Sequence, residues 1–373
     1  MGPHFLQLPE EILLLVLSYL DGRALGRLGQ VCRKLRYFSC RDAVWRRIAR
    51  RCLNSGFVRQ GTDVASGIPV KERVRVSQNW KNGRCRRDIL LKWKRNLMPW
   101  LQVDGDVLYF TQAEEIRAHQ LHGHRHGLHK RPFAVFLGHQ EDVCRFVITD
   151  SHIISGGGDG KIALHNLHST ASIQFTAHEQ DVNCVDCHGG IIVSGSRDRT
   201  ARVWSLSSTA DKRWLHTIQT EDRVWSVAIN PLLSGQLMNC LGTEFRRGAG
   251  VLDVCYETPS ILLSCGYDTY IRCWDLRTSL RRCVNEWEEP HDSALYCIQS
   301  DGNNMIASGS SYYGVIRLWD KRMNRCLQSF SLSSPTSSPV YCLRFNTSHL
   351  YAVLATSLHR LDFTVYRNQF TAL

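Results

Sequence analysis

The sequence predicts a mainly β fold built from repeated units, preceded by a small α-helical domain. Two stretches that begin at Gly138 and Ala177 align without a gap, and their equivalent residues lie 39 positions apart. Each copy contains short alternating strands separated by Gly and Asp turns, which is typical of an antiparallel sheet. Residues 8–51 have instead the apolar spacing of helices. These observations indicate two kinds of domain in one chain.

The composition favours a reducing compartment. With 373 residues, the chain is long enough to bury a large core in more than one domain. Its 15 cysteines are odd in number and scattered, which does not favour a disulfide framework. The longest aliphatic run, Ile12–Leu17, is far shorter than a membrane span, and the N-terminal residues lack the pattern of a secretion signal. We therefore expect a cytoplasmic or nuclear location, or both, and no membrane partner.

Three short helices are predicted in residues 8–51. Pro9 suits the first turn of a helix, and Ile12–Leu20 is apolar on almost every side. A second helix carries one apolar stripe from Leu25 to Leu35, and Asp42 can cap the third. Three short helices cannot bury an all-round apolar helix by themselves. The surplus apolar surface must therefore pack against the rest of the chain or against a partner.

These residues resemble an F-box over its whole length, in a domain that we place at residues 5–52. The matching positions are Leu8–Leu13, Tyr19–Leu20, Leu25–Leu28, Val31–Arg33 and Trp45–Arg46. The resemblance implies a docking surface for Skp1, the adaptor of cullin–RING ubiquitin ligases. The Skp1-binding residues that it implies are Leu8, Pro9, Ile12, Leu13, Leu17, Tyr19, Leu20, Leu25, Leu28, Val31 and Cys32.

A basic segment overlaps and follows these helices. Between Arg23 and Arg95 there are 21 Lys and Arg but only four Asp and Glu. Such a block could bind nucleic acid, or it could be a solvated connector or a face that meets an acidic protein such as Skp1. We favour a solvated connector or a protein-binding face, because few aromatic residues alternate with the basic ones. Nucleic acid is therefore not expected as a partner. Residues 53–95 are predicted to form a basic helical linker.

The repeats resemble the WD repeat, in which each unit builds one four-stranded blade of a β-propeller. The Trp-Asp signature stands at Trp274-Asp275 and Trp319-Asp320, and degenerate forms follow the same spacing elsewhere. The resemblance implies a propeller over residues 96–373 with about seven blades. Its repeats begin near residues 138, 177, 220, 248, 290 and 338, and a degenerate blade occupies 99–137. A closed ring needs its end strand paired, and we expect residues 89–93 to join the last blade near 350–363.

One repeat carries the full set of polar residues known in the WD family. The resemblance implies that His178, Ser194, Asp198 and Trp204 hydrogen-bond one another inside the blade as a structural tetrad. A His–Ser–Asp trio also occurs in hydrolases, but no nucleophile elbow accompanies it here. The sequence therefore favours a structural role for these residues.

One repeat is too short for four strands. The equivalent first-strand positions are Arg145, Cys184, Ser226, Asp253, Cys297 and Cys342, with intervals of 39, 42, 27, 44 and 45 residues. The short interval contains "PLLSGQLMNCLG", residues 231–242, so we predict one blade truncated near 229–242. Its expected remnants are a first strand at 223–229 and a last strand within 234–242. Resemblance to fuller WD repeats indicates an internal deletion.

The cysteines at the equivalent first-strand positions account for the one C-x-x-C pair in the sequence. Cys184 shares its repeating position with Cys297 and Cys342, where a buried Cys acts as a small hydrophobic residue. Cys184 and Cys187 therefore do not indicate a zinc site without a second pair. We expect no metal and no cofactor.

The order of the two domains resembles the F-box/WD-repeat family. No phosphate-binding loop, metal box or nucleophile elbow is present, so we predict that the chain is not an enzyme. The resemblance implies the substrate-recognition subunit of an SCF-type (Skp1–cullin–F-box) E3 ubiquitin ligase, whose propeller binds target proteins for ubiquitination by other subunits. The alternative is a propeller scaffold with a nucleic-acid-binding segment at 23–95.

Some members of the family read phosphorylated peptides with arginines around the propeller channel. By this resemblance the candidate substrate-binding residues are Arg145, Arg197 and Arg223, with Tyr267 and Tyr312 as neighbours. The planar guanidinium group can bond two phosphate oxygens. The alternative is that these are ordinary surface or blade-packing residues.

Overall fold

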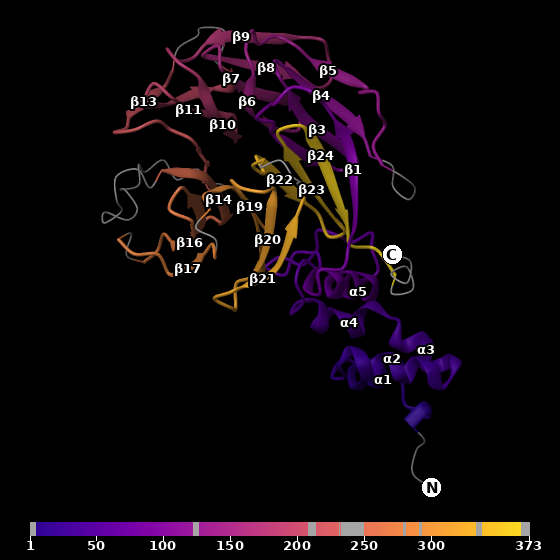
Figure 1. The fold of residues 1–373 in the computed structure, drawn as a ribbon. Coiled ribbons are helices and arrows are strands. Elements are labelled where there is room, and N and C mark those ends of the chain that lie inside the picture. Colours follow the sequence, from indigo (N-terminus) through magenta and orange to yellow (C-terminus); the bar gives the residue numbers. More distant parts are fainter. Residues whose placement is uncertain are drawn as a thin grey trace.

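The computed structural model describes residues 5–121, 127–207, 214–230, 232, 250–278, 281–290, 293–332 and 338–366. The helices lie at one end of the molecule, with α5 next to the strands and α1 to α3 farthest from them (Figure 1). The helical elements are η1 (Phe5–Gln7), α1 (Glu10–Ser18), α2 (Gly22–Val31), α3 (Arg33–Ser39), α4 (Asp42–Ala49) and α5 (Val70–Lys81).

The predicted second helix is two helices, because the chain is extended at Cys32. Its φ of −156° and ψ of 166° end α2, and its Sγ accepts a hydrogen bond from the Leu35 N–H at the start of α3. Asp42 lies inside the first turn of α4 and not at its cap. Its carboxylate accepts a hydrogen bond from the Val70 N–H at 2.9 Å, which ties α4 to α5. The core of this helical domain includes Leu13, Leu17, Leu25, Val44 and Trp45.

The strands form six antiparallel four-stranded sheets, each named here by its strands. The first three are β2 (Leu101–Asp104), β3 (Val107–Gln112), β4 (Glu115–Gln120) and β5 (Ala134–Phe136); β6 (Val143–Ile148), β7 (His152–Gly157), β8 (Lys161–Asn166) and β9 (Ser172–Thr176); and β10 (Val182–His188), β11 (Ile191–Ser196), β12 (Thr200–Ser205) and β13 (His216–Gln219).

The other three sheets follow the short repeat. They are β14 (Val251–Thr258), β15 (Ile261–Gly266), β16 (Tyr270–Asp275) and β17 (Asn285–Glu288); β18 (Leu295–Ser300), β19 (Met305–Ser310), β20 (Val315–Asp320) and β21 (Cys326–Ser331); and β22 (Cys342–Phe345), β23 (His349–Leu354) and β24 (Ser357–Asp362) with β1 (Arg86–Lys92). The fold is a β-propeller whose described residues form six blades, so the predicted count of seven is wrong.

The sequence predicts a truncated blade in the short repeat. Residues 224–230 are described but form no strand, in contrast to the strand expected at 223–229. They still touch both neighbouring blades: the Val224 N–H donates to the Ser196 carbonyl at 2.9 Å, and the Asn230 amide donates to the Pro259 carbonyl at 2.9 Å. The strand predicted within 234–242 lies outside the described residues. The repeat is too short to supply four strands, so this segment bridges two blades.

The ring closes through strand β1, as predicted. Strand β1 pairs antiparallel with β24, with Ile89 opposite His359, and completes the last blade (Figure 1). The last sheet therefore combines strands from the two ends of the propeller. Strand β1 falls within the segment expected to be a helical linker, of which α5 is the helical part.

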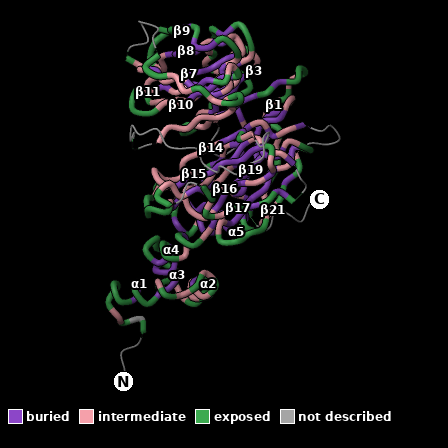
Figure 2. Tube along the Cα trace, turned by 90° about the vertical axis from the view of Figure 1, so that its left-hand side faces the viewer, coloured by how far each residue is buried: buried purple, intermediate pink, exposed green. Residues whose placement is uncertain are grey.

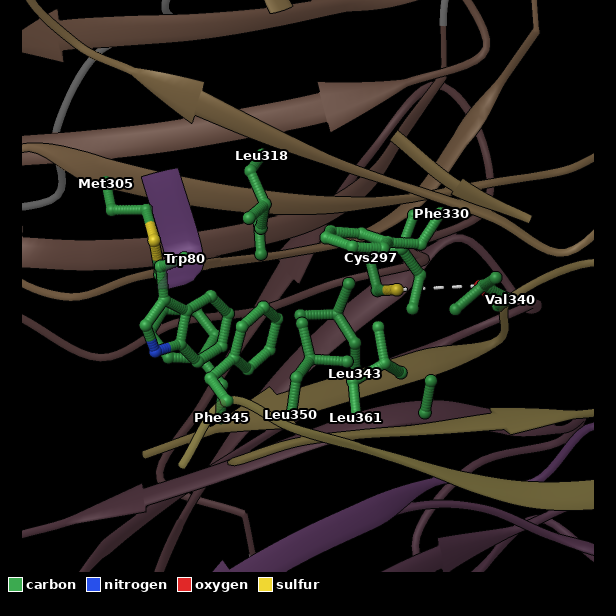
Figure 3. Close-up of a cluster of buried hydrophobic side chains, with 14 of the residues drawn as sticks. Trp80, Cys297, Met305, Leu318, Phe330, Val340, Leu343, Phe345, Leu350 and Leu361 are labelled. Carbon is green, nitrogen blue, oxygen red and sulfur yellow. Dashed lines mark hydrogen bonds between the residues drawn. The ribbon is translucent and has the colours of Figure 1, made fainter. Parts of the chain in front are cut away.

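Helix α5 is packed on the propeller. The Trp80 ring stacks on Phe363 at a centroid distance of 3.5 Å and is completely buried in a cluster with Phe345, Leu350 and Leu361 (Figure 3). Its indole N–H donates to the Thr347 carbonyl at 2.9 Å. The strands and α5 are largely buried, whereas α1 and α2 are exposed over most of their length (Figure 2).

No helix among the described residues has the length and apolar content needed to cross a membrane.

Candidate protein-binding surfaces

An apolar surface on α1 remains uncovered. Ile12 is 44% exposed, Val16 41%, Leu15 55% and Tyr19 70%. Val31, at the end of α2, is 69% exposed. The Arg41 guanidinium donates to Glu10 at 2.9 Å and fixes the start of α1 against the loop before α4. An apolar surface of this kind marks an interaction site.

The predicted Skp1-binding residues are divided between this surface and the core. Pro9, Ile12, Tyr19 and Val31 are exposed, whereas Leu8, Leu20, Leu28 and Cys32 are half-buried. Leu13, Leu17 and Leu25 are at most 1% exposed. In this conformation these three leucines position the surface and do not form part of it. Leu15 and Val16 are missing from the predicted set although they lie on the surface. The aliphatic run that contains them is visible in the sequence, but it does not show which side of the helix faces outward.

The described contacts attach the helical domain to one face of the propeller. The Asn54 N–H donates to Asp301 in the β18–β19 turn, and the Asn54 amide donates to the Asn346 carbonyl in the β22–β23 turn. The Arg322 guanidinium, in the β20–β21 turn, donates to the Arg51 carbonyl. Because strands in these sheets alternate in direction, the turns between second and third strands lie at the opposite ends of the blades. We call that opposite side the distal face.

The predicted tetrad is joined by hydrogen bonds in the β10–β13 blade. His178 Nδ1 lies 3.0 Å from Asp198, and His178 Nε2 lies 2.8 Å from Ser194 Oγ. The Trp204 indole N–H donates to the same Ser194 oxygen at 2.9 Å. Burial is the main reason that the pKa of His178 is lowered, which favours the neutral ring.

The preceding blade contains a similar network that sequence reasoning missed. His139 lies 3.0 Å from Asp159 and 2.9 Å from Ser155. His165 stands where the other blade has Trp204, and its ring packs on Phe136. The 39-residue spacing was sufficient to find His139 and Asp159, but the missing Trp concealed the set.

The Arg145 side chain makes its contacts inside the propeller. Its guanidinium donates to Ser226 Oγ at 2.8 Å and to Asp253 at 3.4 Å, and it stacks over Trp100 at 3.9 Å from the ring centroid. The residue is 9% exposed and lines a cavity of about 490 Å³ inside the ring, together with Arg344. Its charge is therefore paired with a carboxylate of the protein.

The other candidate substrate-binding residues lie on the distal face. Arg197, in the β11–β12 turn, forms an ion pair with Asp181 at 3.5 Å. Arg223 is exposed at the start of the short repeat. Tyr267 and Tyr312, in the β15–β16 and β19–β20 turns, are 44% and 57% exposed. The structure therefore places four of the five candidates on one face but separates Arg145 from them.

Part of the basic segment is also used for folding. Arg73 is 1% exposed and donates two hydrogen bonds to Asp63, at 2.7 and 3.0 Å. Arg75 donates to the Thr364 and Val365 carbonyls. About half of the Lys and Arg residues of the basic segment are exposed on or beside the first four helices: Arg23, Arg27, Arg33, Lys34, Arg36, Arg41, Arg46, Arg47, Arg50 and Arg51.

Among the described residues, no group of three or more His, Cys, Asp or Glu side chains is arranged to hold a metal ion. Burial raises the pKa of the Cys184 thiol to about 12 and that of Cys187 to about 11, which keeps both thiols protonated and poor ligands at neutral pH.

A helical domain with an uncovered apolar surface, joined to a WD-type propeller, defines an F-box/WD-repeat protein. The F-box-like family matches residues 5–51, and the WD domain, G-beta repeat, matches 169–205 and 281–320. Human F-box/WD repeat-containing protein 4 is 61% identical over 97% of this chain and 93% of its own length. The mouse protein of the same name is 61% identical over 96% of this chain and 93% of its length. The chain belongs to the F-box/WD-repeat family.

Two more distant matches agree with this assignment. An F-box protein of Saccharomyces cerevisiae is 30% identical over 21% of this chain and 17% of its own length. The crystal structure of the WD40 β-propeller domain of Doa1 superposes with a TM-score of 0.56 over 74% of this chain and 96% of that chain, at 16% sequence identity. The second match concerns the fold alone.

The alignment with the human protein contains gaps in this chain. It extends over 385 residues, more than the 373 of this chain, so the human protein has residues without a counterpart here. This agrees with an internal deletion.

Proposed function

We propose that this chain is the substrate-recognition subunit of an SCF-type E3 ubiquitin ligase. Its helical domain would bind Skp1 and its propeller would bind the target protein. The observation that carries the proposal is the uncovered apolar surface of α1 within the segment that matches the F-box-like family. We place the working complex in the cytoplasm or the nucleus.

The arrangement of the two domains supports a receptor role. The helical domain is attached to one face of the propeller, and α5 is rigidly packed between them through Trp80. The distal face is left for a second protein. A receptor of this kind acts by proximity, because it holds a target lysine near a ubiquitin-conjugating enzyme that belongs to another subunit. The chain itself would have no catalytic role.

Charge supports the same partner. The described helical domain contains ten Lys and Arg but four Asp and Glu, and the basic side chains are exposed. An acidic adaptor such as Skp1 would be attracted to this surface, which would raise the rate of association.

The first test is capture of purified Skp1 by the full chain. Ile12→Ala combined with Tyr19→Ala removes two exposed apolar side chains, each worth about 1.5–3 kcal/mol when buried in an interface. We expect Skp1 affinity to fall at least about 100-fold, measured by calorimetry. Met98→Ala, an exposed apolar change in the propeller, is the control and should bind Skp1 normally.

Skp1 affinity that is equal in the double variant and the control would contradict the receptor role. A second measurement identifies targets: proteins held by the propeller should accumulate in cells that express the double variant, because they are bound but not passed to the ligase.

A further inference from the structure

The distal face carries an aromatic patch that the proposed function does not yet use. Its members come from the short repeat and from the blades that follow it: Trp225, Tyr267, Tyr296, Tyr312, Tyr313 and Tyr341. The Tyr296 and Tyr341 rings meet edge to face at 5.8 Å, and the Tyr312 and Tyr313 rings are 6.2 Å apart.

The patch is continuous across blades. A Cβ atom at Gly250 would lie 3.4 Å from the Tyr267 ring and 4.0 Å from the Trp225 ring, so these two rings flank the same glycine. Burial, and after it the charges of the neighbouring Tyr267, Tyr341 and Tyr312, raise the pKa of Tyr296. Tyr267, Tyr312 and Tyr313 are 44%, 57% and 64% exposed.

The charge of the distal face differs from that of the whole chain, which is +12. Three carboxylates of the distal face, Asp159, Asp198 and Glu289, are held in buried pairs. Without these three, the described connections on the distal face contain eight Asp and Glu and five Lys and Arg. The described connections around the tyrosines of the patch, 267–269, 289–290, 293–294, 311–314, 332, 338–341 and 355–356, contain no Lys or Arg. At the Trp225 edge of the patch, the exposed Arg223 follows Glu221 and Asp222. The exposed Glu288, which is hydrogen-bonded to Tyr270, and Asp268, which is ion-paired with Arg272 of β16, border the patch.

This chemistry does not suit a phosphate group. A phosphopeptide needs arginines with free donors. Arg145 is instead buried against Asp253 and Trp100, and Arg197 is paired with Asp181. Of the three candidate arginines only Arg223 is exposed at the edge of the patch, and it directly follows Glu221 and Asp222. Tyrosine and tryptophan rings with carboxylates beside them attract Lys and Arg, because the face of an aromatic ring is electronegative.

We propose that the aromatic patch binds an unphosphorylated segment of the target protein that presents Arg or Lys side chains. This proposal rests on the receptor function, and it states the chemical class of the target segment. The basic side chains lie over the Tyr267 and Tyr312 rings.

The test uses the purified full chain and three fluorescent peptide libraries. The three libraries have the same random positions and differ only at two fixed positions. Both fixed positions are Arg in the first library, Gln in the second and phosphoserine in the third. Fluorescence anisotropy should show that the Arg library binds at least about fivefold more tightly than the other two. Tyr267→Ala with Tyr312→Ala should weaken it about tenfold, since two exposed cation–π contacts are lost.

Two control variants separate ring chemistry from folding. Tyr267→Phe with Tyr312→Phe keeps both rings and should bind the Arg library within about twofold of the original chain. Phe133→Ala removes an aromatic side chain that is 60% exposed in the β4–β5 connection and should bind normally. Tyr312→Lys should weaken the Arg library by charge repulsion.

Preference for the phosphoserine library, or equal binding by the Ala and Phe double variants, would overturn the proposal. Skp1 capture is measured on the same preparations. If the original chain captures Skp1 but does not bind the Arg library, only this inference is contradicted. If the original chain binds the Arg library but does not capture Skp1, the receptor function is contradicted and the patch remains a peptide-binding site.

Discussion

Ser194 is the branch point of the tetrad in the β10–β13 blade. Its oxygen accepts from the Trp204 indole and lies 2.8 Å from His178 Nε2, and all three side chains are buried. With the His178 proton on Nδ1, facing Asp198, the Ser194 hydroxyl donates to His178 Nε2. One hydroxyl therefore satisfies two buried partners.

Ser194→Ala should lower the free energy of unfolding by about 2–4 kcal/mol, because it leaves the Trp204 N–H and His178 Nε2 without partners in a dry interior. Urea unfolding measures the change. Ser207→Ala, at an exposed position just after the same blade, is the matched control and should change the free energy by less than about 0.5 kcal/mol. A small effect of Ser194→Ala would mean that water replaces the hydroxyl.

Two buried histidines make the protein sensitive to acid. Burial lowers the pKa of both His165 and His359 to about 4. The unfolded chain binds these protons near the ordinary pKa of about 6.5, so stability is complete above that pH and is lost as pH falls from 6.5 towards 4. We expect each histidine to contribute about 1–2 kcal/mol of destabilisation at pH 5.

The difference in urea midpoint between pH 7 and pH 5 measures this effect. His359→Gln should make the difference smaller, whereas His168→Gln, at an exposed position, should leave it unchanged. The interpretation is wrong if both variants lose the same stability on acidification as the original chain.

At the scale of elements, α5 joins the two domains. The sequence pattern predicted a helical linker that is exposed to solvent, because the basic residues Arg73 and Arg75 lie on the side of α5 that is in fact buried. The tertiary structure pairs Arg73 with Asp63 and packs Trp80 and Asn79 against the end of the last blade. Helix α5 therefore belongs to the core as much as the strands do.

Trp80→Ala should destabilise the protein by about 3–5 kcal/mol, since it removes a completely buried ring and its hydrogen bond to Thr347. Thermal unfolding followed by circular dichroism measures the loss. Gln78→Ala lies on the exposed side of the same helix and should have little effect. Equal melting temperatures for the two variants would show that α5 is not packed as described.

In the molecule as a whole, the described residues form a ring of six complete blades and a bridging segment. Closure through β1 and β24 removes one pair of open edges. Residues 224–230 form no strand between the β10–β13 and β14–β17 blades, and the Ile229 N–H donates to a side chain, that of Asp186. We expect this junction to be the weakest part of the ring.

Replacing residues 231–249 with a segment long enough to complete a four-stranded WD repeat should raise the melting temperature, by about 2–4 °C for each kcal/mol gained. A Gly-Ser insert of the same length is the control and should give no increase. An unchanged melting temperature with the completed repeat would mean that the ring is already closed efficiently around the short repeat.

The order of domains, the repeat spacing and the pairing of β1 with the last blade could all be predicted from the sequence. Each of these depends on local periodicity, or on the need to cover a strand edge, and both can be read along the chain. The Trp-Asp pairs and His178 with Asp198 are visible for the same reason: they recur at fixed distances.

The apolar and charged residues that are available to partners could be identified only from the folded chain. Leu13 and Leu15 are both leucines of one aliphatic run, yet the first is buried and the second is 55% exposed. Arg145 and Arg197 both begin as candidates for phosphate, but Asp253, 108 residues away, neutralises the first. Exposure and charge pairing depend on contacts between distant segments, which spacing along the chain does not specify.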